Sequence, residues 1–362
     1  RENGRLLERA FSHVLELAAR VGVMKVGKVT VAIDGTKILA NASKHSAVSY
    51  EKAGEAMREL DWEVAELLKK AETADSTPLE DGLTVPEEVA RREERKAKLQ
   101  AARAVMEARA AVRAAAERAE YEAKKAEREA RSEQGKKPRG KEPKEPEGKP
   151  GAKDQMNFTD PESRIMPCGG KTHFEQAYNA QAGVEIESRL IITKRVSHAS
   201  NDKQELVEDV RAIDPVIESV ETILIDSGFV SEAAVAEVEA PREDGGSAPK
   251  VIGAVQRQSH HRSVRDLEKK EDPPAPGDEA AFTEKMAHRT ATKEGREKYK
   301  QRQQTIEPVF GIIKEAMGFR RFSLRGQGKA ALEWTLVCVS YNLRRLHRLM
   351  TAQTPKMTPA WA

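Results

Sequence analysis

The sequence predicts a mixed α/β (α+β) fold, in which a mixed sheet is flanked by helices and interrupted by a long charged helical insertion. Apolar β-type runs occur at Val29–Ile33 and Thr222–Ile225. Segments with helical spacing surround them, and residues 51–132 are helical in pattern but rich in charge. The elements do not alternate regularly as βαβα, which argues against a doubly wound nucleotide-binding fold.

The composition sets limits on the class of protein. A chain of 362 residues can hold more than one domain, and 33% charged residues require part of it to be solvated. The net charge is only +3, so a nucleic-acid surface must come from local clustering. Two cysteines, Cys168 and Cys338, exclude a disulfide framework and fit a reducing cytoplasm. No run reaches membrane-spanning length.

The first half of the chain begins in a helical pattern over Leu6–Ala18, and the strand Lys28–Ile33 follows. Because Arg1 already stands within that pattern, we expect an N-terminal region before it. The stretch Glu51–Ser132 favours a long exposed helix or an antiparallel helical pair. It is either a solvated spacer or a coiled-coil or DNA-contacting arm. Residues 134–153 lack apolar side chains and read as a flexible linker.

The second half predicts a hairpin and two further strands. Tyr178–Ile186 and Leu190–Val196 form the hairpin, and Thr222–Asp226 and Val251–Val255 follow. Asp202 is placed to cap a helix that reaches Asp214. Residues 256–285 read as a loop, and helices are expected over 291–317 and 329–350. Without the insertion, this order is compatible with a ribonuclease H-like core interrupted between its first and second strands.

These patterns divide the chain into six segments. They are the end of a truncated helical region (1–24), the first part of the catalytic core (25–45), the helical insertion (46–133), a linker (134–156), the rest of the core (157–350) and a tail (351–362).

Three carboxylates stand out. Asp34 and Asp226 each end an apolar strand run and precede small residues, and Glu307 lies far downstream in a helical pattern. If the two strands are neighbours, the aspartates lie close together and require a cation to offset their repulsion. Carboxylate oxygens select Mg²⁺ or Mn²⁺, and two such ions suit phosphodiester chemistry. Taken singly, each acid fits an ordinary turn or solvated position.

The sequence around Glu307 leaves two local structures open. Ile306, Val309, Phe310 and Ile313 form an apolar stripe, with Glu307 beside it. Pro308 lacks an N–H, so the helix either kinks there or restarts with Pro308 near its first position. In the second case Glu307 stands at a helix N-terminus.

Five segments carry a resemblance to a known family. They are VAIDGTKILANASKH (31–45), NFTDPESRIM (157–166), QAYNAQAGVE (176–185), ILIDSGF (223–229) and YKQRQQTIEPVFGIIKEAMGFRRFSLRG (299–326). Together they resemble a DDE-type bacterial insertion-sequence transposase of the branch with a long insert after the first catalytic strand. The resemblance implies that Asp34, Asp226 and Glu307 bind two Mg²⁺ or Mn²⁺ ions. It also implies strand cleavage at transposon ends and strand transfer to target DNA.

The same resemblance, together with charge clustering, gives the DNA-contact candidates. Tyr299, Arg302, Glu307 and Lys314 fill the Tyr, Arg, Glu, Lys signature of related transposases. The gap from Arg302 to Glu307 is one residue longer than usual, which favours Lys314 over Arg302. Arg320, Arg321 and Arg325 form a basic, glycine-containing loop suited to phosphates, or an ordinary solvated surface. Arg344, Arg345 and Arg348 on the last helix fit a role that only complements the helix dipole.

Three functions remain open at this stage. The first is an active transposase that acts on double-stranded DNA in the bacterial cytoplasm, at the nucleoid, as a homo-oligomer assembled on DNA. The second is a degenerate, inactive copy that only binds DNA or assembles. The third is a metal-free hydrolase in which two acids do general acid–base work, which EDTA-insensitive turnover would indicate.

Overall fold

The computed structural model describes residues 3–73, 84–133, 142–168, 173–241, 246–255, 271–277 and 279–353. The chain divides into two compact units. We call Arg1–Ala42 with Glu162–Ala362 the core unit, and Ser43–Pro161 the helical unit.

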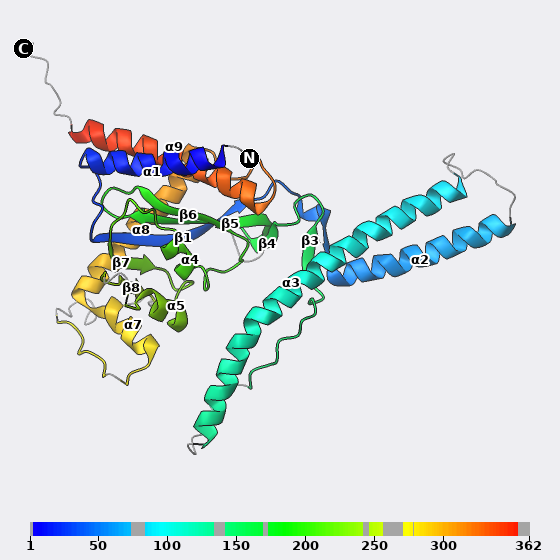
Figure 1. Cartoon of the computed structure of the whole chain (residues 1–362), viewed down its shortest axis with the longest axis horizontal. Coiled ribbons are helices and arrows are strands. Elements are labelled where there is room, and N and C mark those ends of the chain that lie inside the picture. The colour runs from blue at the N-terminus through cyan, green and yellow to red at the C-terminus, as the bar shows by residue number, and fades with distance from the viewer. Residues whose placement is uncertain are drawn as a thin grey trace, which may run out of the picture. The chain divides into compact units, whose positions relative to one another are not determined.

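The core unit is built on a mixed sheet, as predicted (Figure 1). Its six strands follow the order β4-β5-β1-β7-β8, and β6 pairs with β5. Strand β1 runs antiparallel to β5 and parallel to β7. The strands are β1 (Val29–Leu39), β4 (Arg164–Pro167), β5 (Phe174–Glu185), β6 (Ile191–Ser197), β7 (Val220–Ile225) and β8 (Lys250–Gly253). The β5–β6 pair confirms the predicted hairpin.

Helices cover both faces of this sheet. Neighbouring residues of a strand point to opposite faces. On β6, Lys194 reaches Glu8 of α1, whereas the next residue, Arg195, reaches Asp209 of α4. The helices of the unit are α1 (Gly4–Arg20), α4 (Leu206–Arg211), α5 (Glu232–Val238), α7 (Phe282–Ala291), α8 (Lys293–Gly311) and α9 (Gln327–Gln353), with a π-helical turn, η2, at Ile312–Ala316. In Figure 1, α1 and α9 lie side by side above the sheet.

The predicted apolar stripe of α8 is confirmed. Ile306, Val309, Phe310 and Ile313 are all buried in the main core. Trp334, Cys338 and Tyr341 of α9 are buried in the same core, in keeping with packing roles. The core thus joins α8 and α9 to the sheet.

Two local predictions were wrong, and one open alternative was resolved. Strand β1 continues to Leu39, so Asp34 lies inside the strand, because β5 pairs with β1 as far as that residue. Asp202 does not cap α4 with its side chain, because its carboxylate accepts hydrogen bonds from Asn179 and Gln181 instead. Of the two local structures left open at Pro308, the restart is contradicted, since α8 runs through this residue with buried side chains on both sides.

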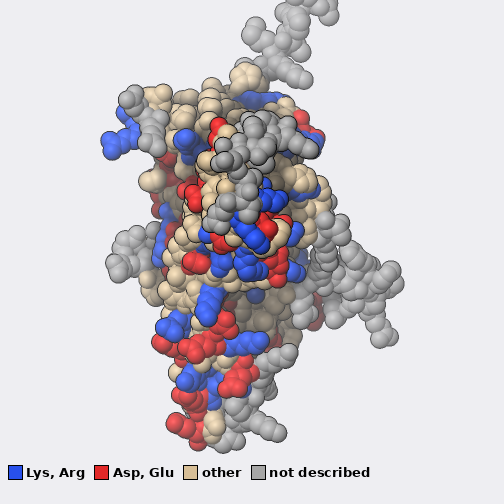
Figure 2. Space-filling view, turned by 90° about the vertical axis from the view of Figure 1, so that its right-hand side faces the viewer, with Lys and Arg blue, Asp and Glu red and all other residues tan. Residues whose placement is uncertain are grey.

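The helical unit contains an antiparallel helical pair, α2 (Tyr50–Thr73) and α3 (Val85–Glu133). Ion pairs join Glu63 to Arg92 and Asp61 to Lys96. The residue numbers increase along one helix as they decrease along the other, so the two helices are antiparallel. The unit also holds a short 3₁₀ helix, η1 (Lys44–Ser46), and a two-stranded sheet of β2 (Ala47–Ser49) and β3 (Gln155–Asn157). Figure 2 shows acidic and basic side chains interspersed on the face drawn.

Parts of the predicted linker and tail, residues 134–141 and 354–362, and residues 256–270 of the predicted loop lie outside the described residues. Helix α7 begins inside the stretch predicted as a loop. Among the described helices, none combines the length and apolar character needed to cross a membrane.

Candidate functional site

Asp34 and Asp226 lie at the same level of the sheet. The parallel pairing of β1 with β7 sets Ala32 opposite Leu224. Asp34 lies two residues after Ala32, and Asp226 lies two residues after Leu224. Adjacent strands are about 4.8 Å apart and residues i and i+2 share a face, so the two carboxylates leave the sheet as neighbours. Sequence reasoning required this adjacency, and the parallel register supplies it.

The Asp34 carboxylate is bound on both oxygens. Its Oδ1 accepts the Gly35 N–H at 2.8 Å, and its Oδ2 accepts from Nη1 of Arg302 at 3.0 Å. Burial raises the pKa of Asp34 to about 6, Arg302 opposes this rise, and the Asp226 charge adds to it. Burial is thus the main cause of the raised pKa, and Arg302 offsets it only in part.

Asp226 follows the last residue of β7 and shapes the turn after it. Its Oδ1 accepts the Gly228 N–H at 2.7 Å, and its backbone carbonyl accepts the Phe229 N–H at 3.3 Å. Within the described residues, Oδ2 of Asp226 accepts no hydrogen bond. The turn thus fixes one oxygen of Asp226 and leaves the other available to a ligand.

Arg302 and Tyr299 come to this pair from α8. The Arg302 side chain is only 8% exposed, and its guanidinium lies 5.9 Å from the centre of the Tyr299 ring. Burial raises the pKa of Tyr299, Arg302 lowers it and Asp226 raises it. The four side chains Asp34, Asp226, Tyr299 and Arg302 therefore form one cluster, which we call the aspartate cluster.

Glu307 lies on the same helix but outside this cluster. It stands five positions after Arg302, which at 100° per residue places it about 140° around the helix. Ile306, which is one turn after Arg302 and lies on the same face of α8, is buried. Glu307 is exposed, and it forms no hydrogen bond or ion pair to any other part of the chain that the structure describes. The aspartates are brought together, and Glu307 is not.

Lys314 stands in the π-helical turn η2, away from the aspartate cluster. Burial lowers its pKa, and the charges that act on it include Cys168, Arg320 and Lys37. The spacing argument favoured Lys314 over Arg302 as a site contact. The structure instead places Arg302 against Asp34.

The predicted basic loop is tied to the end of β1. The Leu39 N–H donates to the Arg320 carbonyl at 3.1 Å, and Arg321 and Arg325 donate to the carbonyls of Ala40 and Asn41 at 3.3 and 3.1 Å. The ring of Phe322 packs edge-on against Tyr178 beneath the loop. These contacts hold exposed arginines on the continuation of the strand that carries Asp34.

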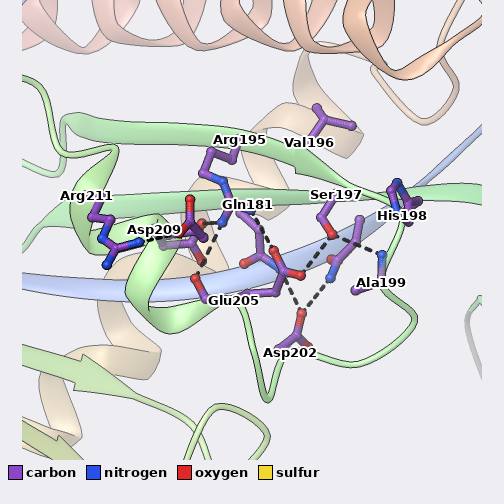
Figure 3. Close-up of polar contacts among 12 residues, drawn as sticks. Gln181, Arg195, Val196, Ser197, His198, Ala199, Asp202, Glu205, Asp209 and Arg211 are labelled. Carbon is purple, nitrogen blue, oxygen red and sulfur yellow. Dashed lines mark hydrogen bonds and ion pairs between the residues drawn. The ribbon is translucent and has the colours of Figure 1, made fainter. Parts of the chain in front are cut away.

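A buried polar network on the α4 face was not anticipated (Figure 3). Arg195 binds Glu205 and Asp209 at 2.9 and 2.7 Å, and Asp202 accepts from Gln181 at 2.7 Å. The only sequence signal was polar residues spaced two apart within β5 and β6. This network lies directly under Gly35, where an added Cβ would stand 2.5 Å from Gln181 Nε2. A larger residue after Asp34 would therefore displace side chains of this network.

A comparison with protein families identifies the C-terminal part of the chain. Residues 277–347, which include α7, α8, η2 and much of α9, match a transposase DDE domain. This match supports a DDE-type insertion-sequence transposase. No match to the chain was found among curated proteins or among solved structures.

Transposases with DDE domains generally bind DNA, cut and rejoin its strands, and use divalent metals. In this chain no three or more His, Cys, Asp or Glu side chains gather closely enough to hold a metal ion, within the residues described. The two aspartates alone supply hard oxygen donors of the kind that Mg²⁺ and Mn²⁺ prefer, and Asp226 has a carboxylate oxygen to spare. This part of the donor set fits a divalent cation.

Proposed function

We propose that the protein is a metal-dependent DNA transposase with a ribonuclease H-like core, which cleaves strands at transposon ends and transfers them to target DNA. The observation that carries the proposal is the pair Asp34 and Asp226, level with one another on adjacent parallel strands. The match of residues 277–347 to a transposase DDE domain supports it. The same proposal includes action in the bacterial cytoplasm at the nucleoid and assembly of copies on DNA.

In this proposal Asp34 and Asp226 hold the metal, and Glu307 is the third ligand. Bound Mg²⁺ or Mn²⁺ would activate the attacking oxygen and stabilise the leaving one. Arg302 lowers the pKa of Asp34 and orients its carboxylate through the 3.0 Å contact. Because Glu307 lies about 140° around α8 from Arg302, its entry requires a rotation or shift of that helix when DNA binds.

The DNA backbone is proposed to contact Tyr299, Arg302 and Lys314, and the loop arginines Arg320, Arg321 and Arg325. The loop arginines are exposed and lie between η2 and α9, and their loop is hydrogen-bonded to Leu39, Ala40 and Asn41 at the end of β1. Arginine and lysine contacts to phosphates position a duplex without reading its sequence. A duplex held there would pass along the edge where the two aspartates emerge.

The test is cleavage of a labelled transposon end in Mn²⁺ by the chain with any preceding region restored. We expect Asp34→Asn, Asp226→Asn and Glu307→Gln each to reduce cleavage by at least about a thousandfold while DNA binding persists, as for loss of a group that acts on the transition state. The matched control is Glu297→Gln, an exposed acid on the same helix, which should cleave normally.

Each outcome has a distinct reading. If only the Glu307→Gln variant still cleaves, the third ligand is misassigned and the aspartate pair stands. If all three variants cleave, the metal site is wrong. A wild-type protein that binds transposon ends without cutting them would point to the degenerate, binding-only alternative.

A further inference from the structure

A pocket lined by four arginines lies between α8, α9 and the β5–β6 hairpin. Arg189 comes from the hairpin, and Arg344, Arg345 and Arg348 come from α9. Its remaining lining is Pro308, Val309, Ile312 and Tyr341. The arginines thus surround a largely apolar floor. None of them belongs to the aspartate cluster or to the basic loop.

The positive charge of this pocket is not neutralised by the protein. None of the four arginines forms an ion pair with an acid in the described part of the chain. Burial lowers the pKa of Arg345, and the charges of Arg189 and Arg348 lower it further. Four guanidinium groups that repel one another around one opening are stabilised when an anion enters it.

Helix capping does not account for these arginines. The favourable interaction of a basic side chain with the helix dipole is confined to the last turn. Helix α9 ends at Gln353, and its last turn contains no basic residue. Arg344 and Arg345 lie two turns or more before that end, so the dipole explanation does not hold for them.

Two of the lining groups are held in place. Nε of Arg345 donates to the Ser188 carbonyl at 2.7 Å, which leaves its terminal nitrogens for another acceptor. The Tyr341 hydroxyl donates to the Arg189 carbonyl at 3.1 Å, which fixes the hairpin end. Arg344 and Arg348 are exposed and stand one helical turn apart. The pocket therefore combines a fixed guanidinium with adjustable ones at its rim.

We propose that this pocket binds a phosphate of the DNA backbone, at a site separate from the contacts described above. Guanidinium groups match the geometry of phosphate oxygens and bind them through paired N–H donors. From Arg302 to Val309 the α8 helix rises about 10 Å, and a duplex carries one charge per about 1.7 Å of its axis. This span is short compared with a duplex, and the proposal assigns both sites to one DNA molecule. The inference rests on the proposed DNA-binding function.

The experiment measures binding of a short labelled duplex of random sequence at about 0.15 M salt. Each phosphate contact contributes about fivefold in affinity under these conditions, from the counterions it releases. The Arg344→Ala, Arg348→Ala double variant should bind about thirtyfold more weakly, and the slope of log K against log salt should fall by about two. Both positions are exposed, so the fold should persist, which circular dichroism checks.

The matched control is Arg5→Ala, Arg9→Ala, two exposed arginines on α1 that should change the affinity less than twofold. Arg345→Lys adds a test of geometry, because it retains the charge and loses the paired donors, and it should weaken binding severalfold. Calorimetric titration with inorganic phosphate distinguishes a free anion from DNA as the ligand.

If the wild type binds DNA and the double variant binds it with the same affinity, the pocket does not bind a DNA phosphate. The proposed function then still stands. A wild-type protein that binds no duplex overturns both. Tight binding of inorganic phosphate that the double variant loses, with no change in DNA affinity, overturns the assignment to DNA.

Discussion

The contact between Arg302 and Asp34 gives the sharpest prediction. Arg302→Met keeps most of the side-chain volume and removes the charge that faces the carboxylate at 3.0 Å. Removal of one partner from a buried ion pair costs roughly 3–5 kcal/mol of unfolding free energy. The Asp34 side chain is 20% exposed, so water screens part of this loss, and we expect about 3 kcal/mol near pH 8.

The loss should depend on pH in a defined direction. The pKa of Asp34 in the folded protein is about 6, above the value of 3.8 for a free side chain. The folded state therefore loses stability as pH rises from about 4 through about 6. Without Arg302 the folded pKa rises further, so the carboxyl stays protonated over a wider range. The cost of Arg302→Met should thus be smaller near pH 5 than near pH 8.

The assay is urea unfolding followed by tryptophan fluorescence, with Arg302→Met measured in wild-type and Asp34→Asn backgrounds. In the second background the arginine has no charge to compensate, and its loss should cost less than about 1 kcal/mol. Arg211→Met, which removes ion pairs to exposed Glu208 and Glu237, should also cost less than about 1 kcal/mol. A coupling energy below about 0.5 kcal/mol between Arg302 and Asp34 would refute the reasoning.

Three further predictions concern the scaffold of the site, each measured by urea unfolding. Gly35→Ala should cost about 1–3 kcal/mol, because its Cβ would stand 2.5 Å from Gln181 Nε2, whereas Gly311→Ala, with open space around it, should cost nothing; equal effects would contradict this. Burial raises the pKa of Asp209 to about 7, so the unfolding free energy of the wild type should fall by up to about 1.4 kcal/mol per pH unit as pH rises toward 7. The Asp209→Asn variant should show a smaller slope. An unchanged slope would show that this carboxyl is ionised throughout. The Asn342 side-chain amide accepts a hydrogen bond from the Ile191 N–H at 2.9 Å and donates one to the Ile191 carbonyl at 2.8 Å. Asn342→Ala should therefore cost about 2–5 kcal/mol of unfolding free energy. A loss below about 1 kcal/mol would mean that other groups form hydrogen bonds with the Ile191 backbone in the variant.

Part of the site could be predicted because its signals are local. A β-branched run that ends in an acid and a small residue marks Asp34 and Asp226, and a 3.6-residue apolar period marks the buried face of α8. These patterns depend on residues within a few positions of each other. The position of Asp34 inside β1 could not be predicted in this way, because the strand is prolonged by pairing with β5 far along the chain.

The partners of the site residues could not be predicted from local pattern. Arg302 and Asp34 are 268 positions apart, and Asn342 and Ile191 are 151 apart. The same is true of the arginine pocket, whose members come from the β5–β6 hairpin and α9. Such contacts depend on which elements become neighbours in the fold, and the spacing of residues within one segment does not predict this.

By itself, then, the sequence determined the mixed α/β class, the acid-bearing strands, the helical insertion and the resemblance to a DDE-type transposase. Only the tertiary structure decided that the two aspartates stand level, that Arg302 rather than Lys314 meets Asp34, and that Glu307 does not join them. The physical reason is that hydrophobic periodicity fixes each element and its buried face, whereas strand register and helix rotation are set by the packing of elements distant in the chain.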